Sequence, residues 1–174
     1  MSTPDHYRMF ASYNAWANTR LYDAAQALPD AEYRRDRKAF FGSLHRTLNH
    51  LMVGDRIWMH RFDGEGETYT QLDLVIFDDL ASLRAAREAE DARIVRYTET
   101  LTPEALAHDL EYTNTQGKTF VTPLPPALDH FFNHQTHHRG QAHALISAAG
   151  AAPPPLDLLI WLREHGVMRV GETA

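Results

Sequence analysis

Apolar residues recur at three- and four-residue intervals over most of the chain, which places them on one face of an α-helix. The first such stretch runs from His6 to Leu28 and ends at Pro29. A second stretch begins near Ser43, whose hydroxyl can accept a hydrogen bond from the free amides of a first helical turn, and it continues to Phe62. The pattern therefore predicts two long amphipathic helices joined by a short connection.

A third helix is predicted after the glycine-containing break at residues 63–66. Asp78 and Asp79 place negative charge at its start, which is favourable next to the positive end of the helix dipole. The helical spacing continues to Tyr97, and Thr102 and Pro103 close the stretch. This helix has a similar length to the first two.

The pattern changes between Leu110 and Val121, where β-branched and aromatic residues surround Gly117 and predict a short hairpin. A fourth long helix is expected after Pro125–Pro126 and should stop at Gly150, ahead of three consecutive prolines. A short last helix is expected over Leu156–Glu164. These elements predict an all-α domain over residues 1–174: a four-helix bundle with a β-hairpin inserted before the fourth long helix and a short C-terminal helix.

Composition excludes several functional classes. A hydrophobic share of 44% with 23% charged residues is sufficient for an ordinary core. A net charge of −6 without a block of lysine or arginine excludes a nucleic-acid-binding surface. No apolar run approaches the roughly 18 residues of a membrane helix, and the N-terminus lacks the apolar run of a signal peptide, so we expect a cytoplasmic protein. The absence of cysteine restricts any metal site to nitrogen and oxygen ligands.

The fourth helix is unusually rich in histidine, with His130, His134, His137, His138 and His143. His134 and His138 are one turn apart, about 40° around the helix, on its apolar face. Each buried imidazole without a partner would cost roughly 1–3 kcal/mol, and a shared divalent ion would satisfy both. We therefore predict this pair as metal ligands. His130 and His137 flank the apolar face and are more simply explained by hydrogen bonds, and His143 is expected to face solvent.

A third ligand is expected from another helix, because catalytic metal sites usually use three protein ligands and leave one position open. The second helix offers His45, His50 and His60. His50 is favoured because it lies at the flank of the apolar face, where its ring could reach the bundle axis while Leu48 and Leu51 pack. Periodicity alone does not choose decisively among the three histidines.

Three segments resemble the DinB-like (DinB/YfiT) metalloproteins: the helix-one sequence of residues 13–18 (YNAWAN), the helix-two sequence of residues 48–51 (LNHL) with Asp55 and Trp58, and the helix-four sequence of residues 134–141 (HQTHHRGQ). Residues 153–157 followed by Trp161 and Leu162 are also similar to the C-terminal segment of that family. The resemblance spans nearly the whole chain. The most specific part is HxxHHRGQ after an upstream histidine.

The resemblance implies a four-helix bundle that binds a divalent metal, commonly nickel or zinc, through His50, His134 and His138. Some relatives have a glutamate in the helix-four motif, but residues 134–141 contain no carboxylate, which places this chain in an all-histidine subgroup. The family is often dimeric, so a homodimer is implied. Related enzymes use the metal to activate a low-molecular-weight thiol such as mycothiol or bacillithiol, and glutathione is a further possible substrate.

The leading functional hypothesis is a metal-dependent enzyme resembling thiol S-transferases, since three neutral ligands leave the metal its full positive charge to lower the pKa of a thiol or water. One alternative is metal-assisted hydrolysis. Another is a non-catalytic, stress-associated bundle that binds a metal or a small ligand. Asp55, Asp129 and His137 are near enough in sequence to be considered as a general base, but none is selected. Asp55 is more simply explained as a helix-surface charge or a partner of helix one.

Overall fold

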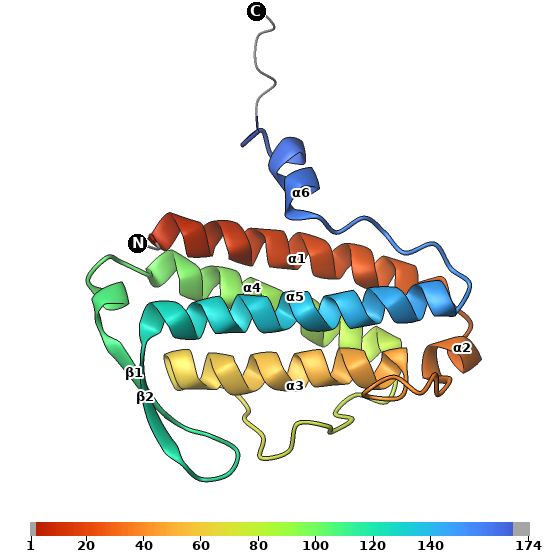
Figure 1. The fold of residues 1–174 in the computed structure, drawn as a ribbon, viewed down its shortest axis with the longest axis horizontal. Coiled ribbons are helices and arrows are strands. Elements are labelled where there is room, and N and C mark those ends of the chain that lie inside the picture. Colours follow the sequence, from red (N-terminus) through yellow and green to blue (C-terminus); the bar gives the residue numbers. More distant parts are fainter. Residues whose placement is uncertain (1–2, 169–174) are drawn as a thin grey trace, which may run out of the picture.

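The computed structural model describes residues 3–168 and consists mainly of four long helices packed side by side (Figure 1). These are α1 (Pro4–Gln26), α3 (Leu44–Asp63), α4 (Leu80–Thr100) and α5 (Leu124–Ala148). Helices α1 and α3 each pack against both α4 and α5, so the order around the bundle is α1, α4, α3, α5. The predicted four-helix bundle is confirmed.

Local capping interactions mark several ends of the helices that were predicted from the sequence. The Ser43 hydroxyl accepts a hydrogen bond from the backbone N–H of Arg46 at 3.2 Å, and α3 ends at Gly64, which adopts a left-handed conformation with φ of 76°. The Asp79 carboxylate accepts from the backbone N–H of Ser82 at 2.8 Å and starts α4. Helix α1 begins two residues before the predicted His6 and also ends two residues early.

The predicted hairpin lies between α4 and α5, as Figure 1 shows at one end of the bundle. Strand β1 (Asp109–Thr113) pairs antiparallel with β2 (Thr119–Pro123). In the turn, the side-chain oxygen of Asn114 accepts hydrogen bonds from the backbone of Gln116 and Lys118, both at 2.9 Å. A short 3-10 helix, η1 (Ala105–Ala107), leads into β1.

The remaining differences from the prediction are two helix starts and one additional short helix. Helix α5 contains Pro125 and Pro126 in its first turn, where proline is tolerated because the N–H groups have no partner in any case. Helix α6 (Leu158–Glu164) starts two residues later than predicted. A five-residue helix, α2 (Asp30–Arg34), was not predicted; it follows Pro29, which ended the helical pattern of α1. None of the described helices is long and apolar enough to cross a membrane.

The described core contains three apolar clusters: two large ones, one toward each end of the bundle, and a small one in which Trp161 of α6 packs with Tyr13 and Ala17 of α1. At the middle of the four long helices lie seven buried polar side chains, each at most 6% exposed, which we call the polar layer: Asn14, Asn18, Asp55, Arg87, Asp91, Gln135 and Arg139. Buried polar groups are tolerated where they bond to one another. Within the layer, two arginines balance two aspartates in charge.

Arg87 of α4 is at the centre of the polar layer. Its guanidinium forms an ion pair with the Asp55 carboxylate of α3, and its Nη2 lies 3.0 Å from Oδ1 of Asp91. The amides of Asn14 and Asn18 on α1 donate to the same Asp91 oxygen at 3.0 and 2.9 Å. Burial lowers the pKa of Arg87, but the Asp91 and Asp55 carboxylates outweigh that effect and raise it, so Arg87 stays charged.

Helix α5 joins the polar layer through two side chains. The Gln135 amide donates to Oδ1 of Asp55 at 3.0 Å, and the Arg139 guanidinium donates to the side-chain oxygen of Asn14. These bonds connect α5 to α3 and to α1 at the level of the histidine-rich stretch. The polar layer therefore fixes the position of α5 relative to α3, the two helices that carry the predicted ligands.

Candidate metal centre

The structure brings together the three histidines that were predicted as metal ligands. His50 of α3 faces His134 and His138 of α5, and one ring nitrogen from each lies within 4.8 Å of those of the other two. The Nε2 atoms of His50 and His138 are 3.1 Å apart. These residues form a group that could hold a metal ion, and we call it the histidine group.

The proton of the His50 ring is fixed by the loop between α3 and α4. Its Nδ1 lies 2.7 Å from the carbonyl oxygen of Leu72. A carbonyl can only accept, so Nδ1 carries the proton and Nε2 keeps a lone pair. Asn49 holds this loop, because its side-chain oxygen accepts from the backbone N–H groups of Ile76 and Phe77, both at 2.9 Å.

The His138 ring is fixed within its own helix. Its Nδ1 lies 2.8 Å from the side-chain oxygen of Gln141, whose amide nitrogen is 3.2 Å from Nε2 of His137. With the Gln141 oxygen as acceptor, Nδ1 of His138 is the donor and its Nε2 also keeps a lone pair. His50 and His138 thus present two lone pairs to each other at 3.1 Å, an arrangement that a cation between them would stabilise.

His134 completes the group. Among the described residues, its buried Nδ1 has no hydrogen-bond partner. Burial and the nearby imidazoles lower the pKa of His134 to about 3, and burial lowers that of His138 to about 4 despite the bond to Gln141. Burial also lowers the pKa of His50. The rings are therefore neutral at pH 7, as ligation requires.

The donor set fits a divalent transition metal. Two ligand nitrogens on a tetrahedral zinc ion, each at about 2.1 Å from it, lie about 3.4 Å apart, close to the observed 3.1 Å. All three donors are imidazoles, which suit zinc, nickel, copper and iron. The unpartnered Nδ1 and the two facing lone pairs are the observations that support a cation here.

Phe41 covers one side of the histidine group. Its ring stacks on that of His50 at 4.0 Å between centroids, with an angle of 22° between planes, and meets His138 edge-on at 5.6 Å. An apolar cover excludes water from this side and strengthens electrostatic interactions within the site.

The other histidines of α3 have different roles. The Nε2–H of His45 donates to the carbonyl of Phe77 at 2.9 Å, and the Nδ1–H of His60 donates to that of Glu65 at 3.1 Å. Both bonds hold the loop after α3. Of the three candidates that periodicity left open, His50 is therefore the one that joins the pair on α5, in agreement with what the family resemblance implies.

The remaining histidines of α5 lie outside the group. His130 and His137 are exposed, and the His130 ring packs 5.0 Å from that of Trp58. His143 is half-buried, with its Nε2–H donating to the carbonyl of Pro154 at 3.0 Å, so the expectation that it simply faces solvent was wrong. The segment after α5 folds back over this residue, which a helical projection cannot show.

The structure also corrects the interpretation of Asp55. It is 1% exposed and bonds to Arg87 of α4 and Gln135 of α5, so it is neither a surface charge nor a partner of helix one. These bonds engage both oxygens of its carboxylate within the polar layer. Asp129, the other carboxylate considered, accepts a hydrogen bond from the Tyr7 hydroxyl at 3.1 Å.

Four residues that shape the site were not predicted. Gly54 leaves room for the His134 ring, Gln141 and the Leu72 carbonyl orient the other two rings, and Phe41 covers them. A glycine inside a helix, four residues after His50, is a signal that could have been used, because glycine costs helix stability unless space is needed. No sequence signal identifies the carbonyl or the phenyl ring.

Three comparisons with known proteins identify the same family. The DinB family profile matches residues 1–167. Protein DinB of Bacillus subtilis (strain 168) is 28% identical over 158 residues, which cover 86% of this chain and 90% of the relative. The crystal structure of a DinB-like protein from Bacillus cereus ATCC 10987 has the same fold, with a TM-score of 0.63 at 20% identity over 84% of this chain and 94% of that chain. The chain belongs to the DinB family.

Proposed function

We propose that this protein is a divalent-metal-dependent enzyme that activates a small thiol for transfer to an electrophile, with His50, His134 and His138 as the metal ligands. The observation that carries the proposal is the pair of Nε2 lone pairs that face each other at 3.1 Å, because both rings have their protons fixed on the opposite nitrogen. The buried Nδ1 of His134, which has no partner in the described part of the chain, adds to it.

A bound metal would supply a Lewis acid that lowers the pKa of a thiol or water at an open position. The chain contributes three neutral donors, so no ligand carboxylate reduces the charge of the ion. Phe41 limits water on one side, while the polar layer holds α5 against α3 through the bond between Gln135 and Asp55. In this way the protein orients the donors before metal or substrate binds.

The proposed reaction balances without an oxidant or a reductant. The thiol gives its proton to solvent, the sulfur electron pair forms a bond to a carbon of the electrophile, and the leaving group departs with the electrons of the broken bond. Among the residues considered as a general base, His137 is the one whose ring lies near the group, 4.8 Å from that of His138. Its exposure suits exchange of a proton with water.

The first test is metal analysis of protein purified without an affinity tag, stripped with a chelator and reloaded with zinc, nickel or cobalt. We expect one ion per chain in the wild type and loss of binding in His50→Ala, His134→Ala and His138→Ala. His143→Ala is the matched control on α5, because this residue bonds to Pro154 and is not part of the group. Equal metal content in all four variants would show that the three histidines do not bind the metal.

The second test is thiol chemistry on the loaded protein. The cobalt form should develop sulfur-to-metal charge-transfer absorption with glutathione, bacillithiol or mycothiol, and it should conjugate the preferred thiol to monochlorobimane. His134→Ala should do neither. Full metal occupancy without thiol binding or turnover would overturn thiol transfer, and ester hydrolysis by the same preparation would then favour a hydrolase over a non-catalytic metal protein.

A further inference from the structure

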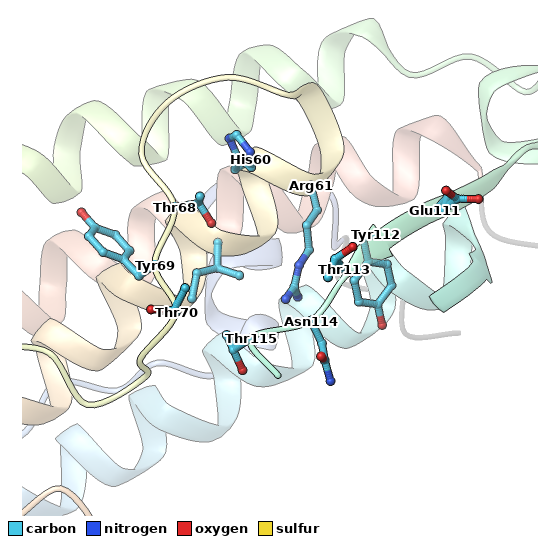
Figure 2. Close-up of a pocket in the computed structure, with 11 residues that line it drawn as sticks. His60, Arg61, Thr68, Tyr69, Thr70, Glu111, Tyr112, Thr113, Asn114 and Thr115 are labelled. Carbon is cyan, nitrogen blue, oxygen red and sulfur yellow. The ribbon is translucent and has the colours of Figure 1, made fainter. Parts of the chain in front are cut away.

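A second candidate binding site lies further along α3 from the histidine group, in a pocket of about 390 Å³ between α3, the loop after it and the hairpin (Figure 2). This volume is within the range of small-molecule sites. Most of the lining side chains are polar and uncharged, with four threonines, one asparagine and two tyrosines. None of the three histidines lines this pocket.

Arg61 is the one arginine or lysine among the residues that line the pocket. In Figure 2 its side chain runs through the middle of the pocket toward Asn114 and Thr115. The guanidinium lies 4.6 Å from the ring centroids of both Trp58 and Tyr112, an arrangement that fixes it by cation–π contact. Arg61 is therefore held in position from two sides.

Within the described part of the chain, the Arg61 guanidinium makes no ion pair and no hydrogen bond. The contrast is with Arg56 on the same helix, which pairs with Glu67 and donates to the Tyr69 hydroxyl at 2.8 Å. Glu111 also lines the pocket but forms no ion pair with Arg61. A half-buried guanidinium without an acceptor has its donors available for a ligand.

The chemistry of the lining favours a carboxylate over a more highly charged group. A guanidinium binds a carboxylate through two parallel hydrogen bonds, and one arginine balances one negative charge. The threonine and asparagine side chains add neutral donors. A polyphosphate would require further cations, and the pocket lining contains no second arginine or lysine.

The pocket is linked to the histidine group by packed rings. The Arg61 guanidinium lies against Trp58, the Trp58 ring is 5.0 Å from that of His130, and the His130 ring is 6.0 Å from that of His134. On α3, Arg61 is eleven residues after His50, or about three turns and roughly 16 Å along the helix axis. A ligand that contacts both places must therefore be extended.

We propose that Arg61 binds the carboxylate of the small-molecule substrate, so that the reactive end of that molecule reaches the histidine group. The placement of the reactive end of the substrate at the histidine group rests on the proposed function. The binding of the carboxylate by Arg61 does not. The inference assigns the substrate to the class of extended organic acids.

The test titrates the metal-free protein with phenylacetate or with its neutral analogue phenylacetamide. Binding is measured from the NMR chemical shifts of the backbone amides of the protein. We expect shifts around Arg61, Tyr112 and Thr115, and at least about tenfold tighter binding of phenylacetate than of the amide. Arg61→Met should abolish that difference. Arg163→Met is the matched control, since it removes one exposed positive charge from α6, outside the pocket.

Thr115→Glu provides a second variant that does not depend on removal of a packed side chain. It places a carboxylate in the pocket on the hairpin turn, where it should pair with Arg61 and exclude the probe. No preference for phenylacetate, a preference retained in Arg61→Met, or equally tight binding of inorganic phosphate would each overturn the proposal. The binding test uses metal-free protein. Its result therefore does not depend on the outcome of the metal-binding and thiol tests of the proposed function.

Discussion

Gly54 of α3 and the His134 ring of α5 approach so closely that no side chain fits between the two helices at this point. A Cβ atom on Gly54 would lie 2.8 Å from Cε1 of His134, 3.5 Å from Nδ1 and 3.7 Å from Nε2. The glycine therefore determines how near the ring can come to His50, which is one turn earlier on α3. Helix packing and the geometry of the donors are coupled at this contact.

Gly54→Ala should weaken zinc binding by at least about tenfold, since the new methyl group would displace a ligand ring. The metal-free protein should keep its free energy of unfolding within about 1 kcal/mol, because the clash is with a side chain that can move and alanine favours the helix. Competition with a chromophoric chelator measures the first quantity and urea unfolding the second.

Gly140→Ala is the control for this prediction. Gly140 lies on α5, and apart from its chain neighbours and the adjoining backbone of its own helix no described atom is within 4 Å of the position that a Cβ would take. The variant should gain helix stability without any change in zinc affinity. Wild-type affinity in Gly54→Ala would show that the close approach does not position His134.

Gln141→Leu should reduce zinc affinity by about tenfold, because His138 would lose the acceptor that fixes its Nδ1 proton and its ring orientation. Gln141→Glu retains an acceptor and should bind at least as well as the wild type. Asn133→Leu, an exposed amide on the same helix, controls for the loss of a polar group. The same chelator competition applies, and equal affinity of Gln141→Leu and Asn133→Leu would contradict the role of Gln141.

The long helices could be predicted because each has a continuous apolar face and a local start signal such as Ser43 or Asp79. The pair His134 and His138 was predictable for the same reason, since both positions lie on one helix. The third ligand was different: the choice among His45, His50 and His60 depends on the packing of α3 against α5 and on the loop that binds the other two. This choice depends on tertiary structure, which helical periodicity does not contain. Before the structure, only the family resemblance indicated His50.

The polar layer shows a further limit of the sequence pattern. Asp55, Arg87 and Asp91 resemble ordinary charges of exposed helix faces, yet all three are buried in contact with one another. Periodicity assigns charge to the surface and has no means to detect a network that forms only when four helices meet. Asn14 and Asn18 in the helix-one motif have a structural role in this layer, because both donate to Asp91.

Arg87→Met should destabilise the protein by about 3–5 kcal/mol, because it leaves the buried carboxylates of Asp55 and Asp91 without their cation. Arg84→Met, one turn nearer the start of α4, removes an arginine that pairs with the exposed Asp23 and Glu88, and it should cost less than about 1 kcal/mol. Urea unfolding of the two variants gives the comparison. Similar losses would indicate that the polar layer is not a unit of stability.

The metal-free protein should lose stability as the pH falls below about 6.5. Burial lowers the pKa of His134 to about 3 and that of His138 to about 4, so both rings stay neutral in the folded state, whereas the unfolded chain takes up protons near pH 6.5. Between these limits the unfolded state binds more protons, and acidification favours it. The slope is at most about 1.4 kcal/mol per pH unit for each histidine.

Urea unfolding of the chelator-treated protein at about pH 7.5, 6.5 and 5.5 measures this dependence across the unfolded-state pKa. The double variant His134→Asn/His138→Asn lacks both titrating rings and retains every other acid and base, so the difference between the two pH profiles isolates the pair. The wild type should lose more stability than the double variant below about pH 6.5, and the two should run parallel above it. Parallel profiles over the whole range would mean that the two rings have the same pKa in the folded and unfolded states, so that the folded protein does not keep them neutral below about pH 6.5.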